Sequence, residues 1–82
     1  MKLRIEPYSG QYMIANTSLG LYYDYLIAEI LELELDEYRE ILIKYNGVEH
    51  ISEDIIFDLH EDAENALNSD ELLPRLIMLN LL

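Results

Sequence analysis

The sequence predicts an α+β fold, a small and mainly helical single domain (residues 1–82) that also contains short β-hairpins. Apolar residues recur at intervals of three and four over most of the chain, which is the helical period. In two other segments polar and apolar residues alternate or β-branched residues are frequent. Turn residues interrupt each of these segments, which favours hairpins. With 82 residues, 51% of them hydrophobic, the chain can fill one core, which excludes a disordered protein.

The N-terminal segment predicts a hairpin. Polar and apolar residues alternate over 2–6, and Pro7 is expected to end that strand. Residues 9–10 (Ser-Gly) supply a turn, and 11–15 form the returning strand. The side chains of 16–18 (Asn-Thr-Ser) then provide oxygens that can cap a helix.

Helices are predicted over residues 19–33 and 35–46, where apolar residues follow the helical period. Glu34 or Asp36 can cap the second helix, and Asn46, followed by glycine, suits a left-handed C-cap. The two segments are either one bent helix or a separate pair. The sequence leaves both possibilities open.

Residues 48–59 predict a second hairpin, because β-branched residues lie on both sides of a turn at 52–54. In this hairpin Ile55, Phe57 and Leu59 share one face. The alternative is a helix capped by the serine of that turn.

Two further helices are predicted over residues 60–68 and 71–81. Pro74 is tolerated because it falls in the first turn of the last helix. That helix is apolar nearly all round, so it is either buried or covered by a second chain. Leu72–Leu82 is therefore a candidate homodimer surface.

Charge is the strongest functional signal. All but one of the 17 Asp and Glu residues lie between Asp24 and Glu71, where Arg39 and Lys44 are the only Lys or Arg, and the net charge is −12. Such a chain is repelled by anionic lipids and by nucleic acid phosphates. We expect a basic protein partner, no direct nucleic acid binding and no membrane association. The absence of cysteine and of a signal-peptide pattern favours the cytoplasm.

The acidic residues show a spacing that can be compared with a nucleic acid. Glu29, Glu32, Asp36 and Glu40 would form one stripe on a continuous helix, with about 6 Å of rise between members four apart. Duplex DNA carries a charge every ~1.7 Å of axis, so one stripe is too sparse. The other candidate partner-binding carboxylates, which raise the density, are Glu34, Glu37, Glu53, Asp54, Asp58, Glu61, Asp62 and Glu64.

Tyrosine is the second signal, since the chain has seven Tyr and one Phe. Three tyrosines, Tyr22, Tyr23 and Tyr25, cluster beside the acidic residues. On one helix, not all three can face the core of the protein. We expect at least one to be exposed, and exposed tyrosine amid charge is a common interface anchor. Tyr22 and Tyr25 are the candidate contacts.

No pattern predicts catalysis, a cofactor or a metal. Acid catalysis needs a carboxyl group sheltered in a dry pocket, which a carboxylate-rich helical face does not suggest. His50 and His60 lack zinc-ligand spacing, and residues 54–65 lack the central glycine of an EF-hand loop. The three glycines form no phosphate-binding loop. We therefore expect a protein that is not an enzyme.

In size, acidic excess and lack of cysteine, and in runs such as 32–37 and 60–64, the chain resembles the small acidic inhibitors of phages and mobile elements, the anti-CRISPR and anti-restriction proteins. The resemblance implies a DNA mimic in the bacterial host cytoplasm. Its carboxylates would replace phosphates in the basic groove of an enzyme such as a CRISPR effector nuclease. The alternatives are an antitoxin or immunity protein against a basic toxin, and a homo-oligomeric structural or adaptor protein.

Overall fold

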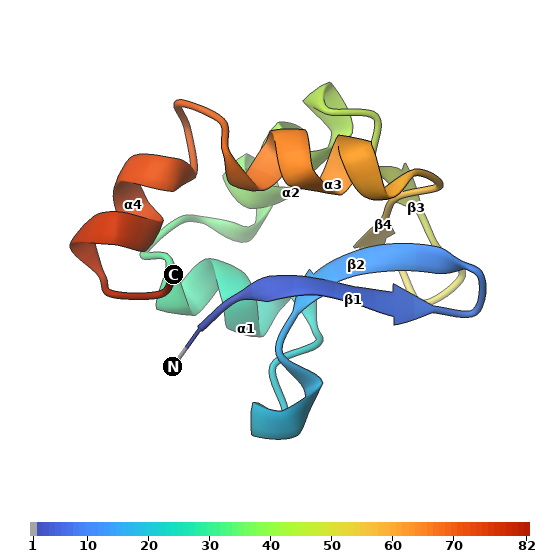
Figure 1. Cartoon of the computed structure of the whole chain (residues 1–82), viewed down its shortest axis with the longest axis horizontal. Helices are drawn as coiled ribbons and strands as arrows, with labels where there is room; N and C mark the ends of the chain where they lie inside the picture. The colour runs from blue at the N-terminus through green and yellow to red at the C-terminus, as the bar shows by residue number, and fades with distance from the viewer. Residues whose placement is uncertain (1) are drawn as a thin grey trace.

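A computed structural model describes residues 2–82 and has the α+β fold that the sequence predicts, with four α-helices and two antiparallel β-hairpins (Figure 1). The principal extents are 30 × 26 × 21 Å. The elements are β1 (Arg4–Tyr8), β2 (Gln11–Ala15), the 3-10 helix η1 (Thr17–Leu19), α1 (Asp24–Ile30), α2 (Leu35–Lys44), β3 (Val48–Glu49), β4 (Ile55–Ile56), α3 (His60–Leu67) and α4 (Leu73–Met78).

The N-terminal hairpin is confirmed, but Pro7 does not end its first strand. Pro7 lies inside β1, opposite Tyr12 of β2. The N–H and C=O of Tyr12 both point the other way, where they bond with the backbone of Phe57. The Pro7–Tyr12 pair therefore exchanges no hydrogen bond, and a proline without an N–H costs nothing there.

Helix α1 begins later than predicted, at Asp24, and residues 16–18 do not cap it. Gly20 adopts a left-handed conformation with φ of 73°, which ends η1 and prevents a helix from running through it. The backbones of Asn16 and Leu21 instead exchange two hydrogen bonds. The Asn16 N–H donates to the Leu21 carbonyl oxygen at 2.7 Å, and the Leu21 N–H donates to the Asn16 carbonyl oxygen at 3.0 Å. The polar residues that looked like a cap thus close a turn between β2 and α1.

Helices α1 and α2 are a pair rather than one bent helix. Glu32, between them, has φ of 59°, a left-handed conformation that a continuing helix cannot contain. Arg75 donates to the carbonyl oxygen of Leu31 at 3.0 Å and so satisfies a backbone group at the end of α1. At the start of α2, Glu37 accepts the backbone N–H of Glu34 at 3.4 Å, which confirms Glu34 as the capping position.

The second hairpin is also confirmed, in a shorter form, by the antiparallel pairing of β3 with β4. Asn46 takes the predicted left-handed conformation after α2, with φ of 70°. The chain then passes close to α2 at Gly47, where an added Cβ would lie 2.7 Å from the carbonyl oxygen of Leu42. Phe57 is buried as expected, but Leu59 is 58% exposed because the strand ends before it.

Helix α4 is shorter than the predicted 71–81 and is only half buried. Pro74 lies in its first turn, as predicted. Leu72 and Leu76 are buried in the core of the same chain, whereas Met78 is 70% exposed. The core side of the candidate dimer segment is therefore already covered without a second copy.

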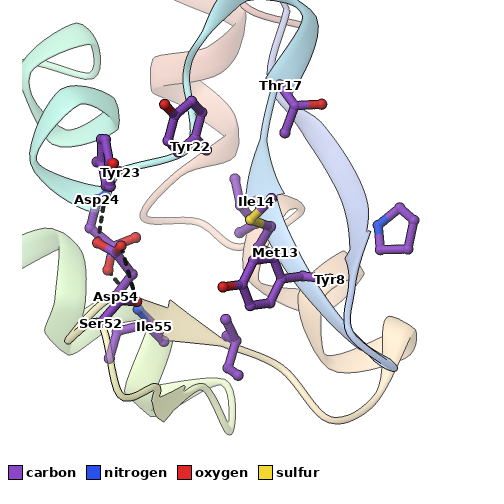
Figure 2. Close-up of a pocket in the computed structure, with 12 residues that line it drawn as sticks. Tyr8, Met13, Ile14, Thr17, Tyr22, Tyr23, Asp24, Ser52, Asp54 and Ile55 are labelled. Carbon is purple, nitrogen blue, oxygen red and sulfur yellow. Dashed lines mark hydrogen bonds between the residues drawn. The ribbon is translucent and has the colours of Figure 1, made fainter.

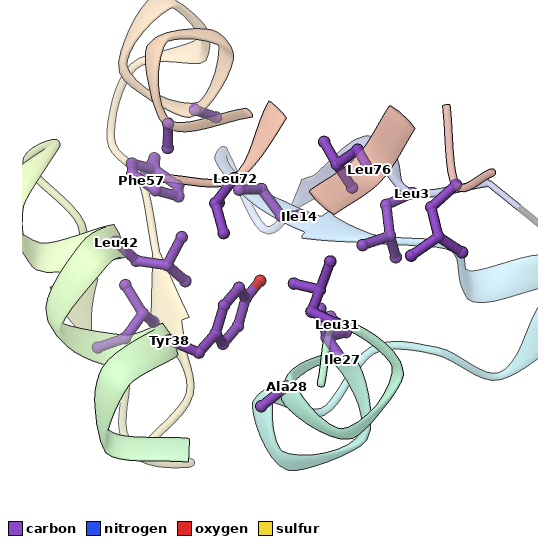
Figure 3. Packing of buried hydrophobic residues seen from close by; sticks show 14 residues of the cluster. Leu3, Ile14, Ile27, Ala28, Leu31, Tyr38, Leu42, Phe57, Leu72 and Leu76 are labelled. Atoms are coloured by element: carbon purple, nitrogen blue, oxygen red, sulfur yellow. The ribbon is translucent and has the colours of Figure 1, made fainter. Parts of the chain in front are cut away.

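The core lies between the helices and the hairpins, as Figure 3 shows. Tyr38 of α2 points into its centre, with Leu31 and Leu72 nearby. A 2.8 Å hydrogen bond from the Leu3 N–H to the Leu81 carbonyl oxygen ties the two ends of the chain together. No helix within residues 2–82 has the length and apolar character needed to cross a bilayer.

Candidate functional site

The predicted partner-binding carboxylates lie on the surface, with Asp54 and Asp62 half-buried and the others exposed. They do not form the single stripe that a continuous helix would give, because the chain turns at Glu32. Glu29 belongs to α1, whereas Asp36 and Glu40 lie one helical turn apart on α2. The acidic surface is thus assembled from several elements.

The positive side chains of the chain are mostly occupied by other groups. Arg4 pairs with Glu6 at 3.3 Å, Arg39 with Glu49 at 3.5 Å and Lys44 with Glu71 at 2.8 Å. Arg75 binds backbone carbonyl oxygens instead of a carboxylate. Within residues 2–82, none of the predicted partner-binding carboxylates forms an ion pair with a lysine or arginine.

Several of these carboxylates also hold the fold together. Asp58 accepts a hydrogen bond from the side-chain amide of Gln11 at 2.6 Å. Asp62 accepts from the amide of Asn46 at 3.3 Å, and Glu64 contacts the ring of His60 at 2.8 Å, one helical turn away. Substitutions at these positions will therefore change local structure as well as charge.

A cleft of about 540 Å³ opens between the N-terminal hairpin and the β3–β4 turn, and we call it the Asp24 cleft (Figure 2). Tyr22, Tyr23, Asp24 and Asp54 lie on one side of it, and Met13 faces them from β2. The remaining lining residues are Pro7, Tyr8, Ile14, Thr17, Ser52, Ile55 and Ile56.

Two carboxylates join α1 to the second hairpin at the edge of this cleft. Asp54 accepts the backbone N–H of Asp24 through Oδ1 at 3.0 Å, and Asp24 accepts the backbone N–H of Ile55 through Oδ2 at 2.7 Å. Burial, together with the charge of Asp54, raises the pKa of Asp24 to about 6.

Nothing in the sequence singles out Asp24. An acidic residue in the first turn of a helix is ordinary, and its partner Ile55 is 31 residues away. Only the burial of Asp24, at 5% exposure, sets it apart from the other acidic residues. The expectation that this fold shelters no carboxyl group was therefore wrong.

Three neighbouring tyrosines form a continuous aromatic surface beside Asp24. The ring centroids of Tyr22 and Tyr23 lie 4.5 Å apart, and Tyr25 stacks on Tyr23 at 5.8 Å. All three are exposed, which confirms the expectation that at least one would be. Tyr22 and Tyr23 line the Asp24 cleft, whereas Tyr25 lines an adjoining recess of about 240 Å³ with Arg39.

His50 is linked to the carboxylate pair through Ser52, because its Nδ1 lies 3.3 Å from Ser52 Oγ, which donates to Asp54 Oδ2 at 3.4 Å. His60 contacts Glu64, and the ring of His50 meets Tyr8 edge-on with centroids 5.2 Å apart. Across residues 2–82, no group of three or more acidic, histidine or cysteine side chains is arranged to hold a metal ion. The Asp24 cleft instead combines carboxylates with aromatic rings, which suits a cationic organic group.

No protein-family model, curated protein or solved structure matches this chain.

Proposed function

We propose that this chain is an inhibitor that occupies the basic nucleic-acid groove of a bacterial enzyme, such as a CRISPR effector nuclease, by presenting a DNA-mimicking acidic surface. The observation that carries this proposal is the lack of lysine or arginine partners for the predicted carboxylates within residues 2–82. Exposed like charges oppose folding, so a surface that keeps them uncompensated suits a partner of opposite charge.

The mechanism is competition for the groove. Carboxylates pair with the Arg and Lys side chains that otherwise hold phosphates, and DNA is thereby excluded. Long-range attraction between the −12 chain and a basic groove speeds association, and salt weakens both the association rate and the affinity. The exposed tyrosines add contacts that depend little on salt.

Capture from a bacterial lysate tests the proposal. The tagged full chain is incubated with lysate and eluted with rising NaCl, and the released proteins are identified by mass spectrometry. A basic nuclease or effector that elutes only at high salt, and whose DNA binding the purified chain blocks, supports the proposal. Captured proteins that bind no nucleic acid, or a blank, contradict it.

A charge-matched pair of variants then separates a specific face from net charge. Asp36→Asn/Glu40→Gln removes two negative charges from α2. Leu19→Lys/Leu82→Lys adds two positive charges at exposed positions near Lys2 and leaves α2 unchanged. Both variants have the same net charge, so only the first should weaken inhibition, by about tenfold or more. Equal losses would contradict a specific face.

Self-association is a second candidate function, favoured by one observation. Ile77 and Met78 on α4 and Leu82 beyond it are exposed apolar side chains near the end of the chain. Sedimentation equilibrium of the full chain tests this candidate. A dimer that Met78→Glu dissociates supports it, whereas a monomer at micromolar concentration contradicts it.

A further inference from the structure

The Asp24 cleft has the chemistry of a site for a positively charged group on a carbon chain. The carboxylates of Asp24 and Asp54 meet at one edge, and apolar side chains such as Met13 and Ile14 line the opposite wall. The rings of Tyr22 and Tyr23 stand beside the carboxylates. At about 540 Å³ the cleft falls within the range of sites that bind small ligands.

One carboxylate oxygen at this site is unused. Asp24 is 95% buried, and its Oδ2 accepts the Ile55 N–H, whereas Oδ1 accepts no hydrogen bond from residues 2–82. Oδ1 is not enclosed by the protein, so a donor that approaches the carboxylate from solvent can reach it. Burial raises the pKa of Asp24 because its charged form is poorly solvated, and a cation in the cleft would stabilise that charged form.

Residues 2–82 place no lysine or arginine side chain in this cleft. Arg39 lies in the adjoining recess behind the carboxylates, and its guanidinium pairs with Glu49 at 3.5 Å. The charge of Arg39 therefore offsets that of Asp24 only in part.

We propose that the Asp24 cleft binds the guanidinium group of an arginine side chain, with Asp24 and Asp54 as its anionic partners and the rings of Tyr22 and Tyr23 as flanking surfaces. The source of this arginine, a basic partner protein, rests on the function proposed above. An arginine fits better than a lysine because its planar fork donates in parallel to carboxylate oxygens and also stacks on aromatic rings.

A titration with isolated amino-acid derivatives tests this site without any partner. The isotope-labelled full chain is titrated at pH 7.5 with N-acetyl-arginine amide, and backbone amide shifts are followed by NMR. Shifts centred on Tyr22, Asp24 and Asp54, with a dissociation constant on the order of 1 mM, are expected. N-acetyl-citrulline amide has nearly the same shape without the charge and should not bind. Citrulline binding, or equal affinity for N-acetyl-lysine amide, overturns the guanidinium assignment.

Two matched pairs of variants locate the site. Asp24→Asn should weaken arginine binding about tenfold or more, whereas Asp70→Asn removes one charge from an exposed position outside the cleft and should leave binding unchanged. Tyr22→Leu removes a flanking ring and should weaken binding, whereas Tyr22→Phe keeps the ring and should bind like the native chain. Equal effects within either pair overturn the inference.

The outcomes for this site and for the proposed function are distinguishable. If a basic nuclease is captured and inhibited but the arginine derivative does not bind, only the cleft inference fails. If the derivative binds at Asp24 and no basic nucleic-acid-binding protein is captured, only the proposed function fails.

Discussion

Asp24 makes the stability of the fold depend on pH. Burial raises its pKa from 3.8 to about 6. Between these two values of pH, the folded state keeps a proton on Asp24 that the unfolded chain has already released. The contribution of the protonated carboxyl group to the free energy of unfolding is complete below about pH 4 and is lost as pH rises through about 6. A rise in pKa of this size corresponds to about 3 kcal/mol.

The first prediction is that Asp24→Asn stabilises the protein at pH 7 by about 1–3 kcal/mol. The amide oxygen can still accept the Ile55 N–H, and no charge is buried. The dependence of the free energy of unfolding on pH between 4 and 6 should also flatten. Urea unfolding across this pH range measures both effects.

Asp24→Ala is the control for this prediction, because it removes the charge and the acceptor together. The N–H of Ile55 then loses its partner in a buried position, so this variant should be less stable than Asp24→Asn by about 1–3 kcal/mol. If the Asp24→Asn variant keeps the full pH dependence of the native chain, another group is responsible.

The hydroxyl group of Tyr38 is the basis of the second prediction. This oxygen is fully buried and has no hydrogen-bond partner among residues 2–82, and burial raises the pKa of the phenol. Tyr38→Phe keeps the ring and removes the unpaired group, so it should raise the free energy of unfolding by about 1 kcal/mol. Thermal unfolding measures this change, and a loss of stability would mean that the hydroxyl is satisfied in solution.

At the scale of elements, most of the fold could be predicted from the sequence because its signals are local. The helical period located α2 and α3, and turn residues located both hairpins. The start of α1 was missed because the side chain of Asn16 bonds with Lys2 and Arg4 at the start of the chain instead of capping a helix. The Asp24 cleft could not be predicted, since it exists only where α1 meets a turn 31 residues away.

The third prediction concerns the break between α1 and α2. Glu32 adopts φ of 59°, which costs a residue with a Cβ about 1–2 kcal/mol but costs glycine little. Glu32→Gly should therefore raise the free energy of unfolding by about 1 kcal/mol. Chemical denaturation measures this free energy of unfolding.

Glu32→Gln is the matched control, since it removes the same charge and keeps the strained backbone. The stability difference between Glu32→Gly and Glu32→Gln isolates the backbone contribution. A glycine variant that is less stable than the glutamine variant would indicate that α1 continues through this position in solution.

At the scale of the whole molecule, repulsion among carboxylates opposes folding. The ion pairs with lysine and arginine use Glu6, Glu49 and Glu71, and they leave the predicted partner-binding carboxylates without such partners within residues 2–82. At 10 mM salt the Debye length is ~30 Å, which matches the longest extent of the protein, 30 Å. All these charges then repel one another across the molecule.

The fourth prediction is that NaCl raised from 10 mM to 100 mM increases the melting temperature by about 4–8 °C, or about 1 kcal/mol. Screening shortens the Debye length to ~10 Å and weakens the repulsion. The Asp36→Asn/Glu40→Gln variant should respond less than the native chain. A melting temperature that falls with salt would mean that ion pairs such as Lys44–Glu71 outweigh the repulsion.

The fifth prediction is that the same salt series has opposite effects on the free chain and on its complex with a basic partner. Carboxylates repel one another in the free chain but are paired with cations in the complex. Screening by salt therefore stabilises the fold of the free chain and weakens the complex. Melting temperature and dissociation constant, measured in the same buffers, should both rise with salt. If the dissociation constant stays flat while the melting temperature rises, the partner is held by apolar contacts and the acidic surface serves solubility instead.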